Sequence, residues 1–295
     1  MSAGNEAGHW RDVLLTALTP VIWGSTYIVT TQLLPPDRPF IAALLRVLPA
    51  GLLLVWMGGW RPRSAEWGRL LILSALNIGA FQALLFVAAY RLPGGLAAVV
   101  GACQPLLVMA LAWRLDCRRP AALALWASLS GVAGMAALLL SPGSSWDGLG
   151  MLAAFGGAVA MACGTYLTRR WQLPAPVTAL TGWQLTLGGL MLLPLALAVD
   201  PPLPSLGWAQ VAGYAYLGLF GALLAYLLWF RGIARLSPVA VSSLGLLSPL
   251  TAVILGWALL GQALSAQSLL GMAVVLASVL AVQWSGGAPA RSGRG

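Results

Sequence analysis

The sequence consists mainly of ten runs of about 20 apolar residues, separated by short polar segments. Each run is long enough to cross a hydrocarbon core of about 30 Å as a helix. With 60% hydrophobic and only 8% charged residues, the composition excludes an ordinary soluble domain. We therefore expect an all-α polytopic membrane protein, with the lipid bilayer as its surroundings. The ten predicted transmembrane helices occupy residues 13–33, 39–58, 69–90, 95–113, 121–140, 148–168, 177–199, 208–230, 238–259 and 266–285.

Arginine supplies all of the positive side-chain charge, and it lies mainly on one side of this topology. The opposite loops contain only Arg38 and Arg91. Because cytoplasmic loops are enriched in Lys and Arg, we expect both termini to be cytoplasmic in a cell inner (plasma) membrane. The net charge of +9 then follows from topology, and no nucleic-acid partner is expected. The arginine-bearing segments are the two tails and residues 61–69, 114–119, 169–170 and 231–235.

The chain lacks the residue clusters that metal sites and enzyme active sites need. The single histidine, His9, lies in the N-terminal tail, and the three cysteines are Cys103 and Cys163 in spans and Cys117 in a loop. This spacing offers no metal cluster, no obvious disulfide and no nucleophile–base pair. We expect no cofactor and no catalytic residues, so the protein is not expected to be an enzyme.

The second half of the sequence repeats the first. "LPGGLAAVVGACQPLL" (residues 92–107) aligns with "LSPVAVSSLGLLSPLT" (residues 236–251), and Trp67 corresponds to Trp208. Each half contains five spans, an odd number, so the second half must enter the membrane from the opposite side. The predicted units are an N-terminal tail, two inverted five-helix repeats and a C-terminal tail, over residues 1–12, 13–146, 147–285 and 286–295.

Inverted repeats are typical of secondary transporters. Two halves related by an axis in the membrane plane form a shared cavity near the midplane and can exchange inward-open and outward-open shapes. The repeat therefore favours a carrier that works by alternating access over a channel or receptor.

Three motifs give the chain a specific resemblance. They are "WGSTY" (residues 23–27), "FIAALLRVLPAGLLL" (residues 40–54) and "LPGGLAAVVGACQPLLVMALAW" (residues 92–113). In this order they resemble the drug/metabolite transporter superfamily, in the ten-helix type built from two EamA-like units. The resemblance extends over roughly residues 12–285. Within this superfamily the chain is similar to amino-acid and metabolite exporters, including the YddG amino-acid exporter group. It implies export of a small metabolite.

Two prolines are predicted to form gates or hinges. A proline inside a helix cannot donate its backbone hydrogen bond, and it frees the carbonyl four residues earlier. For Pro105 and Pro249 these carbonyls belong to Gly101 and Gly245. The alternative is a packing kink in which small residues allow close helix approach.

Arg46 is the one charge well inside a predicted span, about 10 Å below the outer boundary at 1.5 Å per residue. It could bind a substrate carboxylate, or it could join helices by bonding to carbonyls, and the sequence favours the second role. Trp23, Thr26 and Tyr27 give the first span a polar face suited to a wet cavity. The further candidate binding residues are Asn77, Gln82, Gln104, Tyr166, Trp183, Gln184, Tyr216 and Ser248.

The expected substrate is a small molecule, most simply a neutral or aromatic amino acid. One cation, several neutral hydrogen-bonding groups and aromatic rings suit a zwitterion with an apolar side chain. An exporter of drugs or other hydrophobic metabolites is the alternative, and a membrane-embedded enzyme or scaffold is a further one. No acid lies near the midplane, so we expect facilitated movement or exchange without a driving ion.

Overall fold

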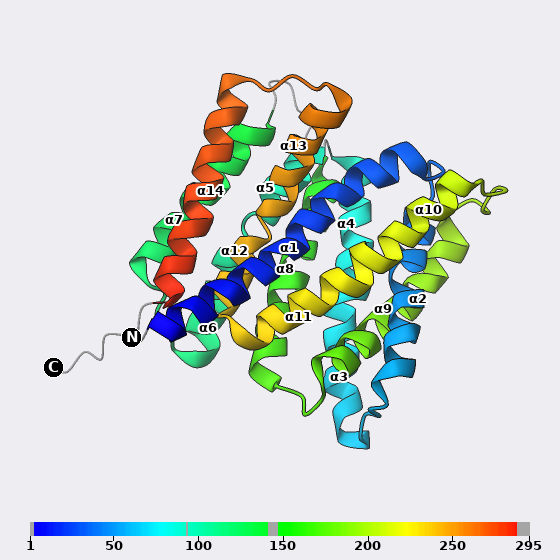
Figure 1. The fold of residues 1–295 in the computed structure, drawn as a ribbon, viewed down its shortest axis with the longest axis horizontal. Coiled ribbons are helices and arrows are strands. Elements are labelled where there is room, and N and C mark those ends of the chain that lie inside the picture. The colour runs from blue at the N-terminus through cyan, green and yellow to red at the C-terminus, as the bar shows by residue number, and fades with distance from the viewer. Residues whose placement is uncertain (1–2, 93, 141–146, 288–295) are drawn as a thin grey trace.

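The computed structural model describes residues 3–92, 94–140 and 147–287, and all regular structure in these ranges is helical. Ten helices in them are long and apolar enough to cross a membrane, which confirms the predicted fold class. Figure 1 shows them as one bundle. Six spans are single helices: α1 (Ala3–Leu33), α2 (Pro39–Gly58), α7 (Ala122–Leu139), α8 (Gly148–Trp171), α9 (Val177–Val199) and α14 (Ala266–Gly287).

The other four spans are each built from more than one helical segment. The third contains η1 (Ser64–Glu66), α3 (Trp67–Ser74), the π-helical turn η2 (Ala75–Gly79) and α4 (Ala80–Arg91). The fourth contains α5 (Gly94–Gly101) and α6 (Gln104–Asp116). The eighth contains α10 (Trp208–Tyr216), the π-helical turn η3 (Leu217–Leu224) and α11 (Ala225–Arg235). The ninth contains α12 (Pro238–Leu244) and α13 (Leu247–Leu260).

The most extensive helix pairs are α2 with α9 and α7 with α14. Small residues allow the first pair to approach closely. A Cβ at Gly51 would lie 2.5 Å from the backbone nitrogen of Thr186, and one at Gly182 would lie 2.8 Å from the Cβ of Leu54. Close backbone approach at glycine is a common basis of helix association in lipid. This contact joins the second and seventh spans and holds the side of the bundle on which Arg46 lies.

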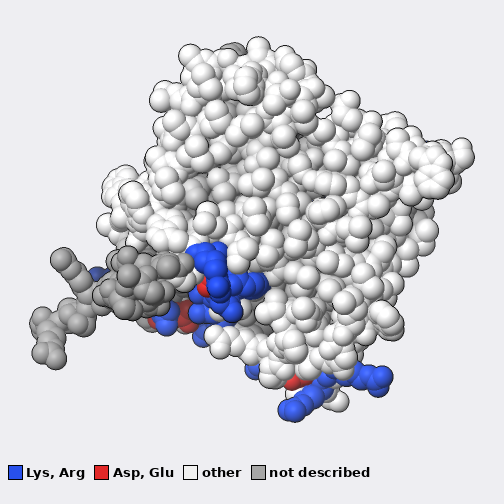
Figure 2. All heavy atoms as spheres, in the orientation of Figure 1, with Lys and Arg blue, Asp and Glu red and all other residues white. Residues whose placement is uncertain are grey.

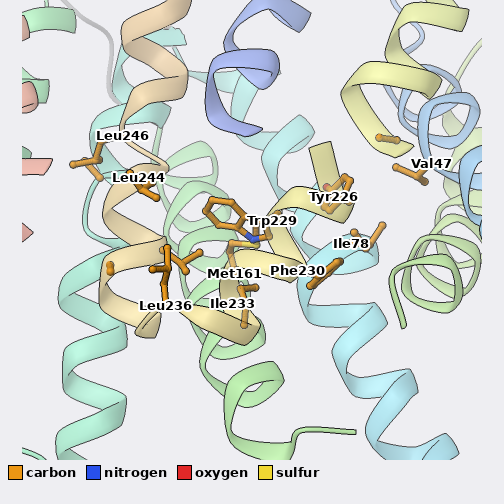
Figure 3. Close-up of a cluster of buried hydrophobic side chains, with 14 of the residues drawn as sticks. Val47, Ile78, Met161, Tyr226, Trp229, Phe230, Ile233, Leu236, Leu244 and Leu246 are labelled. Carbon is orange, nitrogen blue, oxygen red and sulfur yellow. The ribbon is translucent and has the colours of Figure 1, made fainter. Parts of the chain in front are cut away.

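Aromatic side chains of α11 occupy the centre of the bundle. Tyr226, Trp229 and Phe230 are 1–2% exposed and belong to the main hydrophobic cluster, together with residues of most other spans. Figure 3 shows Trp229 between Leu244 of α12 and Met161 of α8, with Tyr226 further along α11. The centre is therefore apolar and aromatic on the α11 side.

The third and eighth spans each contain a π-helical turn, which the sequence pattern does not predict. η2 and η3 each begin about two helical turns after the tryptophan that starts the α-helix of the span. A π-turn widens the helix, displaces carbonyls from the regular bonding pattern and often occurs at functional sites. These two turns lie at corresponding places in the two halves.

At both predicted proline kinks the α-helix is interrupted by a short, tighter turn, in which backbone N–H groups bond to carbonyls three residues back. α5 ends at Gly101 and α6 begins at Gln104, while α12 ends at Leu244 and α13 begins at Leu247. Each proline lies in the first turn of the helix after the break, where its missing N–H is not needed.

The carbonyl expected to be free in the ninth span is already bonded. Gly245 accepts a hydrogen bond of 3.1 Å from the backbone N–H of Ser248. The expectation of a free Gly245 acceptor is therefore wrong in this conformation, because the chain tightens around the break. A hinge role for the glycine–proline pairs remains a prediction.

Charged side chains gather at one end of the bundle. Figure 2 shows arginine and acidic residues along one edge, at the end where α1 and α3 begin, and an almost uncharged surface above them. α1 begins at Ala3, so it extends into the segment 1–12 that was assigned to a tail, and α14 continues to Gly287. We call this end the arginine-rich end and the other the opposite end.

Candidate functional site

Arg46 is held by one backbone carbonyl of the π-helical turn η3. Its Nε and Nη2 atoms donate hydrogen bonds of 3.3 and 2.9 Å to the carbonyl oxygen of Gly221. Its Nη1 atom makes no hydrogen bond to a described residue, yet it is not among the buried polar atoms without a partner. The guanidinium is therefore anchored along one edge and accessible at Nη1.

Gly221 must be small for this arrangement. A Cβ at this position would lie 3.2 Å from Thr26 Cγ2 and 3.3 Å from Arg46 Nε. Trp23 also donates to the same carbonyl, with an Nε1–oxygen distance of 3.0 Å. One carbonyl thus receives donors from α1 and α2, and the π-turn fixes Trp23 and Arg46 relative to each other.

The aromatic wall beside Arg46 comes from α1 and α11. The Trp23 ring lies 5.1 Å from that of Tyr226 and 5.2 Å from that of Trp229. Tyr226 also accepts a hydrogen bond of 3.3 Å from Gln82 Nε2. Two predicted site residues, Trp23 and Gln82, therefore meet at Tyr226, which was not predicted from the sequence.

Thr26 and Tyr27 differ in their surroundings although they are adjacent. Thr26 is 7% exposed, and its hydroxyl donates to the carbonyl of Trp23 in its own helix. Tyr27 is 52% exposed, makes no hydrogen bond within the described residues, and lies within electrostatic range of Arg46. Tyr27 is therefore free to contact a ligand near Arg46, whereas the Thr26 hydroxyl is bonded within its own helix.

Asn77 and Gln184 form a sealed amide cluster between η2, α8 and α9. Asn77 Nδ2 donates to Gln184 Oε1 at 2.7 Å and to Thr168 Oγ1 at 3.1 Å. Asn77 is 1% exposed and Gln184 is fully buried. Gly164 completes the seal, because a Cβ there would lie 2.2 Å from Asn77 Oδ1. This geometry indicates a connection between helices, with no open face for a substrate.

The Arg46 site and the amide cluster occupy corresponding places in the two halves. The first joins the first, second and eighth spans through η3, and the second joins the sixth, seventh and third spans through η2. Gln184 is the sequence counterpart of Arg46. The difference is accessibility: the Arg46 guanidinium keeps an accessible donor, whereas Asn77 and Gln184 are buried, with Asn77 Oδ1 and Gln184 Nε2 left without partners among the described residues.

The remaining predicted residues do not join the Arg46 site. Gln104 lies at the break of the fourth span with its Nε2 buried and without a partner among the described residues, and its Oε1 lies 3.9 Å from where a Gly245 Cβ would be. The backbone of Ser248 contacts Gly24, whose Cβ would lie 2.5 Å from the Ser248 carbonyl oxygen. These residues pack the two broken spans against each other and against α1.

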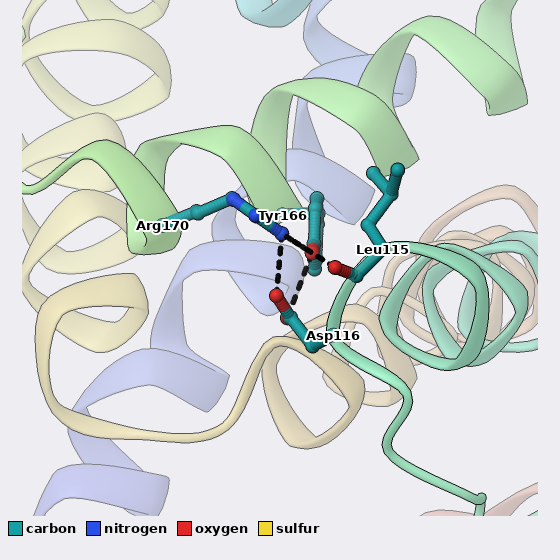
Figure 4. A network of polar contacts seen from close by, with 4 residues as sticks. All are labelled: Leu115, Asp116, Tyr166 and Arg170. Atoms are coloured by element: carbon teal, nitrogen blue, oxygen red, sulfur yellow. Dashed lines mark hydrogen bonds and ion pairs between the residues drawn. The ribbon is translucent and has the colours of Figure 1, made fainter.

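Tyr166, Trp183 and Tyr216 have partners outside the Arg46 site. Tyr166 donates to Asp116 Oδ2 at 2.7 Å near the arginine-rich end, where Arg170 contacts both residues (Figure 4). Trp183 Nε1 donates to the Trp60 carbonyl at 3.2 Å, and the Tyr216 hydroxyl lies 2.6 Å from Ser25 Oγ. A substrate role for these three residues remains a prediction.

Ion pairs connect four spans at the arginine-rich end. Asp12 of α1 lies 2.6 Å from Arg231 and 3.6 Å from Arg235 of α11, and we call these three residues the Asp12 latch. Arg170 of α8 pairs with Asp116 of α6. The Asp12 carboxylate is only 14% exposed. This end of the bundle is therefore closed by charge pairs that are partly shielded from water.

The opposite end has one loose ion pair and a pocket. Arg91 and Asp147 lie 3.6 Å apart and their side chains are 48% and 37% exposed. A pocket of about 410 Å³ lies between the start of α2 and the ends of α4 and α9. A smaller apolar groove of about 190 Å³ lies between α6 and α8, and it contains none of the predicted site residues.

Within the described ranges, no group of three or more His, Cys, Asp or Glu side chains could hold a metal ion.

Comparison with known proteins assigns the family. The EamA-like transporter family model matches twice, over residues 10–140 and 148–284. Protein PecM of Dickeya dadantii is 43% identical over 90% of this chain and 89% of its own length. The uncharacterized inner membrane transporter YedA of Escherichia coli K12 is 29% identical over 89% and 87%. A solved crystal structure with 19% identity has a TM-score of 0.76 and covers 94% of this chain and 97% of that chain, which shows a shared fold. The chain therefore belongs to the EamA-like transporter family, within the drug/metabolite transporter superfamily.

Proposed function

We propose that this membrane transporter exports neutral amino acids with large apolar or aromatic side chains. The observation that carries the proposal is the accessible Nη1 of Arg46, fixed by Gly221 beside aromatic side chains. A substrate carboxylate bound there would form a charge-assisted hydrogen bond. Tyr27 and Trp23 would contact the substrate side chain.

The site is less suited to the alternative substrates. A permanently cationic drug would be repelled by Arg46, and the described residues place no acidic side chain near the guanidinium that would compensate. A phosphorylated substrate would usually be met by several arginine or lysine groups. The single anchored guanidinium is better matched to one carboxylate.

Alternating access between two inverted repeats is the proposed mechanism. The double match of the family model and the paired π-turns support two equivalent halves. The Asp12 latch at the arginine-rich end and the pocket at the opposite end support an outward-facing conformation, if the arginine-rich end is cytoplasmic. The predicted unit boundaries near residues 13, 147 and 285 belong to this proposal.

Exchange in proteoliposomes tests the function. Vesicles loaded with unlabelled phenylalanine should accumulate external radiolabelled phenylalanine by counterflow, without a pH or Na⁺ gradient, because substrate binding alone drives the exchange. Protein-free vesicles are the control. Competition by leucine and tryptophan, but not by a quaternary ammonium dye, is expected. Transport of the dye with no effect of any amino acid would favour the drug exporter instead.

Cysteine labelling tests the orientation. Ser64 and Ser205 are exposed residues at the arginine-rich and opposite ends. In a variant without the native cysteines, Ser205→Cys in intact cells should react with a membrane-impermeant maleimide, whereas Ser64→Cys should react only after permeabilisation. The reverse pattern would place the termini outside.

A further inference from the structure

The pocket at the opposite end contains unusual charges for this chain. Asp37, Asp200 and Arg91 line it together with apolar side chains, among them Phe40, Val87 and Val199. The chain has 16 arginine residues and only 7 acidic ones, so an acid without an arginine partner is unexpected. Asp12, Asp116 and Asp147 each form an ion pair. Within the described ranges Asp37, Asp200 and Glu66 do not, and of these only Asp37 and Asp200 line the pocket.

Asp200 has one carboxylate oxygen in use and one without a partner. Oδ2 accepts a hydrogen bond of 2.6 Å from the Ile41 N–H, so Asp200, the residue that follows α9, caps the start of α2. The residue is 9% exposed, and its Oδ1 is buried without a hydrogen-bond partner among the described residues. A buried carboxylate oxygen without a donor is costly, which indicates that a donor is supplied from outside this set of residues.

Asp37 is held in the pocket lining by an unusual backbone conformation. Its φ angle is +61°, in the left-handed region that residues other than glycine rarely adopt. The neighbouring Arg38 does not neutralise it by an ion pair, because Arg38 donates to the carbonyls of Pro202 and Pro36 at 3.0 and 2.7 Å. The carboxylates of Asp37 and Asp200 therefore give the pocket a negative side.

Arg91 gives the same pocket a positive group that is only weakly engaged. It lies 3.6 Å from Asp147, with nearly half of its side chain exposed. Exposed ion pairs at this distance contribute little, so a ligand carboxylate can compete with Asp147 for Arg91. The pocket volume of about 410 Å³ lies within the usual range for small-molecule sites.

We infer that this pocket is a second amino-acid site, at the opposite end of the bundle from the Asp12 latch. The ligand ammonium would donate to the carboxylates of Asp200 and Asp37. Its carboxylate would face Arg91, and its apolar side chain would pack on Phe40, Val87 and Val199. The substrate class rests on the proposed function. The site itself rests on the two carboxylates without an ion pair that line one pocket, and on the buried Oδ1 of Asp200, which has no partner among the described residues.

Ligand binding in this pocket should depend on pH. Burial raises the pKa of Asp200, while hydrogen bonds from the start of α2 and the charge of Arg38 act in the opposite direction. Among the described side chains, Tyr214, Asp37 and Arg91 are the other titratable or charged groups in its surroundings. Because only the ionised carboxylate attracts an ammonium group, affinity should fall as the pH decreases, beginning above the pH at which an ordinary aspartate is protonated.

A protection experiment tests the site directly. In protein without native cysteines, reconstituted in nanodiscs, Val199→Cys reports on the pocket through its rate of reaction with a maleimide. Saturating phenylalanine should slow labelling roughly tenfold, because the bound side chain covers Val199, whereas N-acetylphenylalanine, which lacks the ammonium, should not. Phenethylamine should protect less than phenylalanine because it has no carboxylate for Arg91.

Two isosteric variants identify the ammonium partners. Asp200→Asn keeps an oxygen to accept from Ile41, and Asp37→Asn tolerates a positive φ, so both should fold. Each should weaken protection by phenylalanine roughly tenfold or more, as expected for loss of a charge-assisted hydrogen bond. Glu66→Gln, at the arginine-rich end, is the matched control and should leave protection unchanged.

The outcomes separate this inference from the proposed function. If phenylalanine is exchanged in proteoliposomes but does not protect Val199→Cys, the second site is wrong and the transport function stands. Equal protection by N-acetylphenylalanine, or unchanged protection in both aspartate variants, would also overturn the site. If phenylalanine is neither exchanged nor protective, both proposals fail.

Discussion

Replacing Arg46 by alanine is expected to abolish amino-acid exchange while leaving the protein folded. Among the described residues, Arg46 is the one charged donor near Tyr27, so the variant loses the group that would pair with a substrate carboxylate. A hydrogen bond to a charged group contributes about 1.5–3 kcal/mol, so Kd should rise roughly 10- to 150-fold. The Gly221 carbonyl keeps Trp23 Nε1 as a donor, and the π-turn therefore retains a partner.

A comparison of ligands separates substrate binding from a structural role. The wild-type protein should bind phenylalanine more tightly than its methyl ester, and Arg46→Ala should bind both equally weakly, as measured by calorimetry. The affinity of Arg46→Lys for phenylalanine should fall between those of the wild-type protein and Arg46→Ala. A guanidinium can donate to the Gly221 carbonyl from one edge and to a substrate from another, which an ammonium group cannot do. Arg61→Ala, an exposed arginine without a described partner, is the control. If Arg46→Ala retains the preference for the free acid but melts at a much lower temperature, Arg46 only joins helices.

The transmembrane architecture could be predicted from sequence because hydrocarbon thickness sets the length of each apolar run. All ten predicted spans correspond to observed candidate spans. Local irregularities within the spans were harder to predict from the sequence. The interruptions after Gly101 and Leu244 were expected only as kinks. The π-turns that begin at Ala75 and Leu217 contain no proline, and Asn77 inside the first of them was predicted only as a binding residue. They are stabilised by neighbouring helices, which a single sequence does not reveal.

The polar residues of the candidate site were predicted from the sequence, but the glycine and aromatic residues that hold them in place were not. Arg46, Trp23 and Gln82 stood out because polar groups in lipid are costly. Gly221, Tyr226 and Trp229 lie in an apolar run where glycine and aromatic residues are common, so nothing distinguished them. The Gly-Ala pair inside the run that contains Gly221 could have suggested an irregular turn, but many membrane helices contain such pairs.

Gln184 and Asn77 were predicted as binding residues because they are polar groups inside spans, and that role remains a prediction. Gln184 is also the counterpart of Arg46 in the repeat, so both residues lie at the junction that corresponds to the Arg46 site. In the structure the same three-span junction is filled by amide hydrogen bonds and sealed by Gly164. The repeat therefore predicts where junctions form, while the side chains at each junction decide whether it is open.

Removing the Asp12 latch is expected to shift the transporter towards a conformation open at the arginine-rich end. Asp12→Asn loses the pairs with Arg231 and Arg235 and leaves Arg231, whose side chain is 24% exposed, without its carboxylate. The pair is neither fully exposed nor fully buried, so its loss should cost the closed state about 1–3 kcal/mol. This corresponds to a change of roughly 5- to 150-fold in the ratio of the two conformations.

Accessibility from each side measures this shift. Tyr27→Cys, half exposed beside Arg46, is labelled with an impermeant maleimide from one side of oriented vesicles at a time. Asp12→Asn and Arg231→Gln should each speed labelling from the arginine-rich side and slow it from the opposite side. Asp147→Asn removes the looser and more exposed pair at the opposite end, which is already formed in this conformation, so it should change labelling from either side less than Asp12→Asn does. The charge-exchanged double variant Asp12→Arg with Arg231→Asp should restore part of the closure, because the attraction is regained with its polarity reversed. Equal effects of Asp12→Asn and Asp147→Asn would show that the two pairs only stabilise the fold and do not govern which end is open.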